Sequence, residues 1–221
     1  MTDTAQAKLA VKTHDRPSPT IFVLTLVLVA ATSWWTVQWM VVRWEQPSSY
    51  YSHGWLIPPI VAFLIYRKRR ELAADPKAPS WWGLAALPPF IGLHLLATAW
   101  RIGFVSGFAL IGMLGAVVLA LWGRRVLWTL LFPLAFLAFM VPVPDVLIEL
   151  VSFRLKLLAA GVASGMMGLF GLPVVREGSF LHIPAGTVVV DDVCSGLKYL
   201  IALTAFGALY AYISPLRGIR R

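Results

Sequence analysis

The sequence predicts an all-α integral membrane protein, a polytopic helical bundle of about six spans plus one interfacial helix and a small extended β flap on the outer face. Of its 221 residues, 59% are hydrophobic and only 13% are charged, and the mean hydropathy is +0.76. A soluble domain would have too little polar surface to cover so many apolar side chains. The 19 Lys and Arg residues form short clusters between apolar runs. Nucleic-acid binding would instead place them along one face, so we expect the lipid bilayer as a partner and no nucleic acid.

The first two segments are a polar tail and an apolar run. Residues 1–19 are expected to form a cytoplasmic tail. Residues 20–42 are long enough to span, because a helix needs roughly 20 residues to cross the hydrocarbon core. The run ends with Trp34, Trp35 and Trp39, which are typical of a membrane interface. A cleaved signal peptide is the alternative, and the long polar lead and the tryptophans disfavour it.

The next three spans follow from apolar runs bounded by cations. A second crossing is predicted after "SSYYSHGW"; it is broken by Pro58-Pro59 and ends at the cytoplasmic cations of residues 67–70. Residues 81–100 and 102–122 predict a helical hairpin that turns at Arg101. The whole chain from residue 20 to 221 is expected to be one membrane domain.

Residues 126–143 predict a fifth span that ends at the rigid "VPVP" turn, and residues 195–214 predict the last one. The segment 146–170 is mostly apolar, but Glu149, Arg154 and Lys156 interrupt it. We expect it to lie at the outer interface, as an amphipathic or re-entrant helix. The inner side then holds 13 Lys or Arg and the outer side six, in agreement with the positive-inside rule. Both ends would be inside. If the segment crosses instead, the polarity of everything after it reverses.

The stretch "GLPVVREGSFLHIPAGTVVVDD" changes character, because Gly and Pro separate short β-branched runs. This pattern predicts a small hairpin or extended flap. Open sheet edges do not survive in hydrocarbon, so we expect the flap to lie on the membrane surface.

Cys194 is the only cysteine of the chain and therefore cannot form an internal disulfide. It stands at the expected start of the last span, where free amides and the helix dipole favour a thiolate. Lys198, four residues on, would share its helix face, whereas Asp191 and Asp192 would oppose ionisation or bind substrate. Ser195 is a further candidate for substrate binding. The alternative is an inert thiol packed at a helix end.

Three stretches resemble blocks of the exosortases, bacterial membrane transpeptidases related to archaeosortases. "GTVVVDDVCSGLKYLIALTAFGALYAY" resembles the cysteine block, and "YSHGWLIPPIVAFLIYRKR" resembles the early Tyr-Ser-His-Gly block. "VPVPDVLIELVSFRLKLLAAGVASGMMGLFGLPVVREG" resembles the segment between them. The resemblance covers about residues 48–221, with the blocks in the family's order.

The resemblance implies a cysteine protease or transpeptidase that needs no cofactor. It would cleave C-terminal sorting signals of exported proteins (a Pro-Glu-Pro type motif, a membrane helix and a basic tail) at the outer side of the bacterial inner membrane. It also implies a link to surface sorting and the exopolysaccharide matrix. The family triad is Cys, Arg and His, and its Cys maps onto Cys194. The other two belong to later blocks, so we expect a truncated member that is inactive alone.

The four histidines have different expected roles, and their spacing predicts no metal site. His53, expected on the outer side, either approaches the cysteine loop or anchors the interface with its neighbouring tyrosines. His182 is expected at the surface of the flap, His94 to hydrogen-bond within the bundle, and His14 lies in the tail. Two other readings stay open: a non-catalytic scaffold that binds the substrate, and a transporter-like bundle, for which the broken "IPPI" helix is the only indication.

Overall fold

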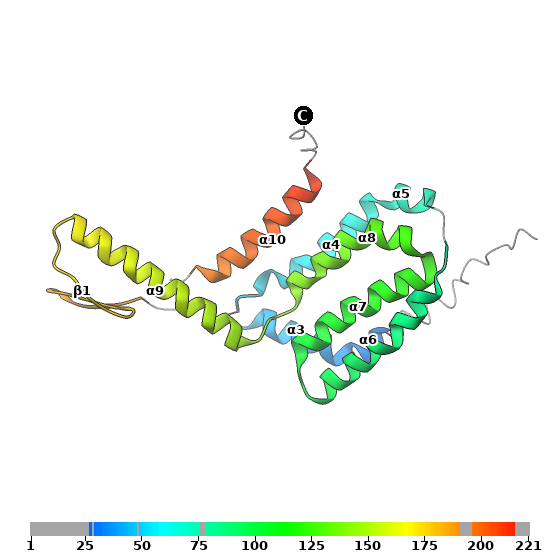
Figure 1. Cartoon of the computed structure of the whole chain (residues 1–221), viewed down its shortest axis with the longest axis horizontal. Helices are drawn as coiled ribbons and strands as arrows, with labels where there is room; N and C mark the ends of the chain where they lie inside the picture. The colour runs from blue at the N-terminus through cyan, green and yellow to red at the C-terminus, as the bar shows by residue number, and fades with distance from the viewer. Residues whose placement is uncertain (1–26, 28, 48, 76–77, 191–195, 215–221) are drawn as a thin grey trace, which may run out of the picture. The chain divides into compact units, whose positions relative to one another are not determined.

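The computed structural model describes residues 27, 29–47, 49–75, 78–190 and 196–214, and these residues are mostly helical (Figure 1). The contacts divide the chain into two compact units. The first comprises the described residues up to Val42 together with Gly54–Val141. The second comprises Arg43–His53 and the described residues from Pro142 onward. The predicted tail, residues 1–19, lies outside the described residues.

The described residues of the first unit are mostly helical. Its elements include α3 (Trp34–Glu45, as far as Val42), α4 (Ile57–Arg67), α5 (Arg69–Ala74), α6 (Trp81–Ala99), α7 (Gly103–Trp122), α8 (Arg124–Phe136) and the turn η2 (Leu137–Met140). Helical residues also precede α3, and the turn at Ser33 separates them from it. The three tryptophans predicted for the first span lie on α3.

The antiparallel hairpin of α6 and α7 confirms the predicted one almost to the residue. Arg101 takes a left-handed φ of 55°, and the backbone N–H of Ile102 donates to the carbonyl of Ala97 at 2.8 Å to close the turn. Lipid offers no hydrophobic drive for helices to associate, so small residues that permit close approach hold spanning helices together. Gly83 serves this purpose, because a Cβ placed there would overlap the backbone of Ala120.

Helix α4 differs from the predicted second crossing. Pro58 and Pro59 lie in its first turn, where proline costs no hydrogen bond because the first N–H groups of a helix have no intrahelical partner. The prolines therefore start the helix, and the expectation that they break a longer one is corrected. With 11 residues, α4 is about 16 Å long, roughly half the thickness of the hydrocarbon core.

Among the described residues, two helices are long and apolar enough to cross a membrane, namely Trp81–Ala99 and Gly103–Trp122. A third span results if Arg124–Met140 and Asp145–Leu169 are counted together, and Leu197–Ile213 is a shorter apolar helix. The protein therefore has two to three candidate spans in this part of the chain. The predicted number of about six is not confirmed.

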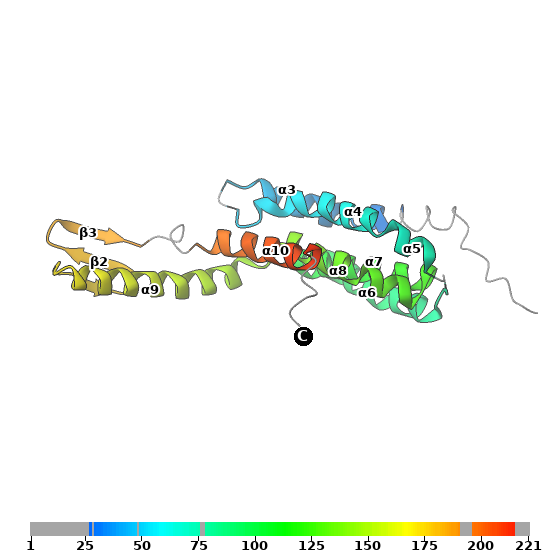
Figure 2. The same cartoon turned by 90° about the horizontal axis from the view of Figure 1, so that it is seen from above.

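The second unit contains a long helix, a small sheet and a final helix. Helix α9 (Asp145–Leu169) is continuous through the segment whose placement was ambiguous. Strands β1 (Val175–Glu177), β2 (Phe180–Ile183) and β3 (Gly186–Val189) form an antiparallel meander in the order β1-β2-β3. The predicted flap is thus a three-stranded sheet. It lies beside the C-terminal half of α9 (Figure 2), where the Arg176 guanidinium covers Gly161.

Substitution of Gly83 should weaken the α6–α7 hairpin. In Gly83→Ala the added methyl meets the Ala120 backbone, which cannot move aside as a flexible side chain would. We expect a loss of about 1–3 kcal/mol in the free energy of unfolding, measured by denaturant titration in detergent micelles.

Gly92→Ala is the matched control, because it lies on the same helix and a Cβ there has no neighbour within 4 Å. Since alanine is the better helix former, Gly92→Ala should be neutral or stabilising. Equal losses in the two variants would contradict the close packing at Gly83.

Candidate functional site

Four of the predicted site residues lie outside the described residues. They are Asp191, Asp192, Cys194 and Ser195. The described chain resumes at Gly196, directly before the last helix.

That helix, α10 (Leu197–Ile213), begins later than the predicted start at Cys194 or Ser195. Gly196 precedes it with a left-handed φ of 67°, a conformation that glycine adopts at little cost and that helices do not contain. Helix α10 therefore starts at Leu197. Cys194 lies outside the described residues, so the expected i, i+4 placement of Cys194 and Lys198 on one helix face stays a prediction. Lys198 itself is exposed in the first turn of α10, where it remains a charge close in sequence to the cysteine.

His53 belongs to the second unit, in the 3-10 turn η1 (Ser52–Leu56). It is half-buried, and its ring centroid lies 6.0 Å from that of Tyr51. His53 therefore lies beside Tyr51, and its predicted role as an interface anchor stays a prediction. Whether His53 meets a substrate stays a prediction.

A polar cavity of about 230 Å³ lies in the second unit, where the segment after α3 meets the start of α9. Its lining combines charged, amide, hydroxyl and phenol groups with a few apolar side chains. The lining residues are Arg43, Gln46, Ser49, Tyr50, Tyr51, Pro142, Val143, Asp145 and Ile148. The cavity is smaller and more polar than most ligand sites, but its convergent polar groups make it a candidate for binding a small polar group.

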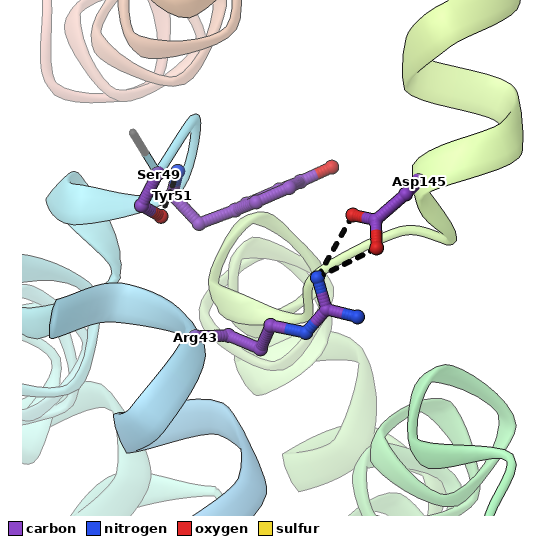
Figure 3. A network of polar contacts seen from close by, with 4 residues as sticks. All are labelled: Arg43, Ser49, Tyr51 and Asp145. Atoms are coloured by element: carbon purple, nitrogen blue, oxygen red, sulfur yellow. Dashed lines mark hydrogen bonds and ion pairs between the residues drawn. The ribbon is translucent and has the colours of Figure 1, made fainter. Parts of the chain in front are cut away.

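An ion pair forms one wall of this cavity (Figure 3). Arg43 Nη1 donates to both carboxylate oxygens of Asp145, each at 2.8 Å. Asp145 is the first residue of α9, where the helix dipole favours a negative charge. The Arg43 and Asp145 side chains are 32% and 62% exposed, so water screens the pair and it contributes only about 0–1 kcal/mol to stability. The pair therefore contributes little to stability, and its main effect is to present two accessible charges to the cavity.

Tyr51 supplies a buried phenol to the same cavity, and its side chain extends toward Asp145 (Figure 3). Only 8% of the residue is exposed. Its backbone N–H donates to Ser49 Oγ at 2.9 Å, which fixes the turn. Burial raises the pKa of Tyr51 above its usual value; the backbone of Val143 opposes this shift and the charge of Asp145 adds to it. At neutral pH Tyr51 is thus a protonated hydrogen-bond donor.

The sequence did not indicate that Arg43 and Asp145 form an ion pair. They lie 102 residues apart, and each is a single charge beside an apolar run. No spacing rule joins them. The available signal was that Asp145 directly follows "VPVP" and so begins a helix.

The other described histidines have structural partners. In the first unit His94 is 1% exposed; its Nδ1 lies 3.0 Å from Ser106 Oγ and its Nε2 lies 3.1 Å from the Thr32 carbonyl. The prediction that it hydrogen-bonds within the bundle is confirmed. In the second unit His182 is on β2, within 2.9 Å of Thr187 and 3.6 Å of Glu177. Within the described ranges, no group of three or more His, Cys, Asp or Glu side chains could hold a metal ion.

Replacing Tyr51 should change the alkaline pH dependence of stability. Because the pKa of Tyr51 is raised in the folded protein, its contribution is fully present below the ordinary tyrosine pKa of about 10. It is lost as the pH rises through the folded-state value. Tyr51→Phe should therefore lose less unfolding free energy than the unsubstituted protein between about pH 9 and 11. Denaturation in micelles measures this, with Tyr50→Phe as control. Identical pH profiles for Tyr51→Phe and the unsubstituted protein would contradict it.

A family model described as transmembrane exosortase (Exosortase_EpsH) matches residues 39–221. No curated protein and no solved structure matches the chain. The match spans the resemblance noted in the sequence and extends it to include Arg43. Since it covers far more than half of the residues, the chain belongs to the transmembrane exosortase family.

Proposed function

We propose that this protein is a membrane cysteine transpeptidase that processes C-terminal sorting signals of exported proteins, with Cys194 as nucleophile. The observation that carries the proposal is the family match over residues 39–221, which contains the only cysteine of the chain. The proposed location is the inner membrane, with Cys194 facing outward. The 13-to-six distribution of Lys and Arg in the favoured topology supports that orientation.

The reaction proposed for Cys194 has two steps. The thiolate attacks the carbonyl carbon of the scissile peptide bond, the C–N bond breaks, and the leaving nitrogen takes up a proton, which leaves a thioester. The nitrogen of an acceptor amine then attacks the thioester carbonyl, loses a proton, and displaces the thiolate. The resemblance assigns proton transfer to a histidine and charge stabilisation to an arginine from later blocks. We assign neither role to a residue of this chain.

The start of α10 supports an ionised thiol. The first amides of a helix lack intrahelical acceptors and carry a partial positive charge. In the sequence, Cys194 and Ser195 are followed by Gly196 and then by Leu197, the first residue of α10. The first turn of α10 also carries the exposed cation Lys198. Both features favour thiolate over thiol.

We assign the polar cavity to binding the polar motif of the sorting signal. Arg43 offers a cation that can exchange the Asp145 carboxylate for a substrate carboxylate, and the protonated Tyr51 offers a donor beside it. A guanidinium suits carboxylate recognition because its donors match the two oxygens. His53, Ser195, Lys198, Asp191 and Asp192 remain proposed contributors to substrate binding.

Replacing the nucleophile should abolish processing. In cells that process the reporter, Cys194→Ala should leave a reporter with a C-terminal sorting signal uncleaved, because no thioester can form. Immunoblotting of reporter size measures this. Normal processing by Cys194→Ala would remove the nucleophile assignment and favour a non-catalytic scaffold.

The control for that variant uses the same cysteine as a topology probe. With Cys194 as the only thiol of the chain, a membrane-impermeant maleimide should label the unsubstituted protein in spheroplasts and should leave Cys194→Ala unlabelled. Protection until the membrane is opened would contradict the outward orientation.

The two partners of the ion pair should respond differently to substitution. Arg43→Gln should reduce reporter cleavage roughly tenfold, as expected for loss of one charge-assisted hydrogen bond. Asp145→Asn breaks the same pair but keeps the cation, so cleavage should be retained or increased. Cleavage rates at several reporter levels measure this. A purely structural ion pair predicts equal losses in both variants, which would exclude the binding role of Arg43.

A further inference from the structure

A second, apolar groove lies entirely within the first unit. Helices α4 and α5 form one side of the groove, and α7, α8 and η2 form the other. The four helices are labelled in Figure 1. Its volume is about 610 Å³, in the usual range of small-molecule sites. Aliphatic side chains dominate the lining, among them Ile65, Leu114, Val118, Leu130, Leu134 and Leu137. The groove thus suits a flexible apolar chain.

Cationic charge gathers at one end of this groove. Arg69 is the only charged residue among the described lining residues, and it belongs to the four consecutive cations of residues 67–70. The Arg69 guanidinium lies 4.0 Å from the centre of the Tyr66 ring, and its Nη1 donates to the Tyr66 carbonyl at 3.2 Å. These contacts hold Arg69 against a second lining residue. The cation is therefore positioned at the mouth of the groove by α4 itself.

The neighbouring charges leave this end positive. Lys68 donates to the Thr129 carbonyl at 3.2 Å and lies 3.7 Å from Glu71, which offsets part of its charge. The other nearby acid, Asp75, accepts a hydrogen bond from Thr129 at 3.1 Å. Arg67 and Arg70 are exposed beside Arg69. Four cations and one acid thus occupy five consecutive positions.

We propose that the groove binds an acyl chain of an anionic phospholipid, with Arg69 and its neighbouring arginines holding the headgroup phosphate. An apolar channel that ends in a cation cluster matches the two parts of such a lipid. Basic clusters beside membrane helices bind anionic headgroups, and guanidinium groups bind phosphate through paired donors. The positive-inside rule places this cluster in the cytoplasmic leaflet. The site is distinct from the proposed peptide-processing site and does not depend on it.

The test is thermal unfolding of the purified protein in a neutral detergent during titration with lipid. Phosphatidylglycerol should stabilise the protein in a saturable manner, and phosphatidylcholine with the same acyl chains should bind at least about fivefold more weakly. Arg69→Gln should weaken phosphatidylglycerol binding about fivefold, and Arg69→Lys should retain most of it. Leu134→Trp, which fills the groove, should weaken binding of both lipids.

Arg101→Gln is the matched control, because it also removes one arginine charge but does so away from the groove. Arg101 lies at the hairpin turn before α7, whereas Trp122, which lines the groove, is at the opposite end of that helix. It should bind both lipids like the unsubstituted protein. Equal stabilisation by the two lipids, or unchanged binding in Arg69→Gln, would overturn the proposal. So would equal stabilisation by inorganic phosphate alone, which would indicate a phosphate site without a lipid chain. Unchanged lipid binding in Leu134→Trp would show that the acyl chain does not enter the groove, and this result would also overturn the proposal.

Discussion

The absence of water in a bilayer core requires each polar group of a spanning segment to find its partner inside the protein. The polar cluster around His94 in the first unit follows this requirement. His94, deep in α6, lies within hydrogen-bonding distance of Ser106 and the Thr32 carbonyl, and Ser106 in turn lies 2.6 Å from Thr36. In lipid, helices gain little from hydrophobic burial against one another, so α6 and α7 approach closely at small residues such as Gly83. Helices α6 and α7 contain no Asp, Glu, Lys or Arg, and Arg101 lies at the turn between them.

The same requirement explains which features the sequence could predict. The α6–α7 hairpin and its turn at Arg101 followed from two apolar runs separated by one cation, because length and charge alone determine such a unit. The flap followed from Gly and Pro punctuation, although its three-stranded register did not. The role of Pro58-Pro59 was misjudged, since a proline pair that starts a helix and one that breaks it look alike in sequence. The Arg43–Asp145 pair depends on tertiary contact across 102 residues, which no local pattern encodes.

Function in this family member is proposed to lie at the membrane surface, where the second unit gathers its polar groups. The cavity of Arg43, Tyr51 and Asp145 combines an accessible ion pair with a protonated phenol, which suits recognition of a charged peptide better than bond cleavage. The cleavage chemistry is proposed for Cys194, with support from the family match over residues 39–221. Peptide recognition and peptide cleavage would thus use different elements of the second unit, and lipid binding would use the first unit.

The proposed thioester on Cys194 is the intermediate on which the transpeptidase account depends. Mass spectrometry of the protein isolated from cells that overproduce a sorting-signal substrate, and quenched in acid, would detect it. The account predicts a substrate-derived acyl group on the peptide that contains Cys194, which neutral hydroxylamine releases. Efficient substrate processing with Cys194 always recovered unmodified, or an acyl group recovered on another residue, would contradict it.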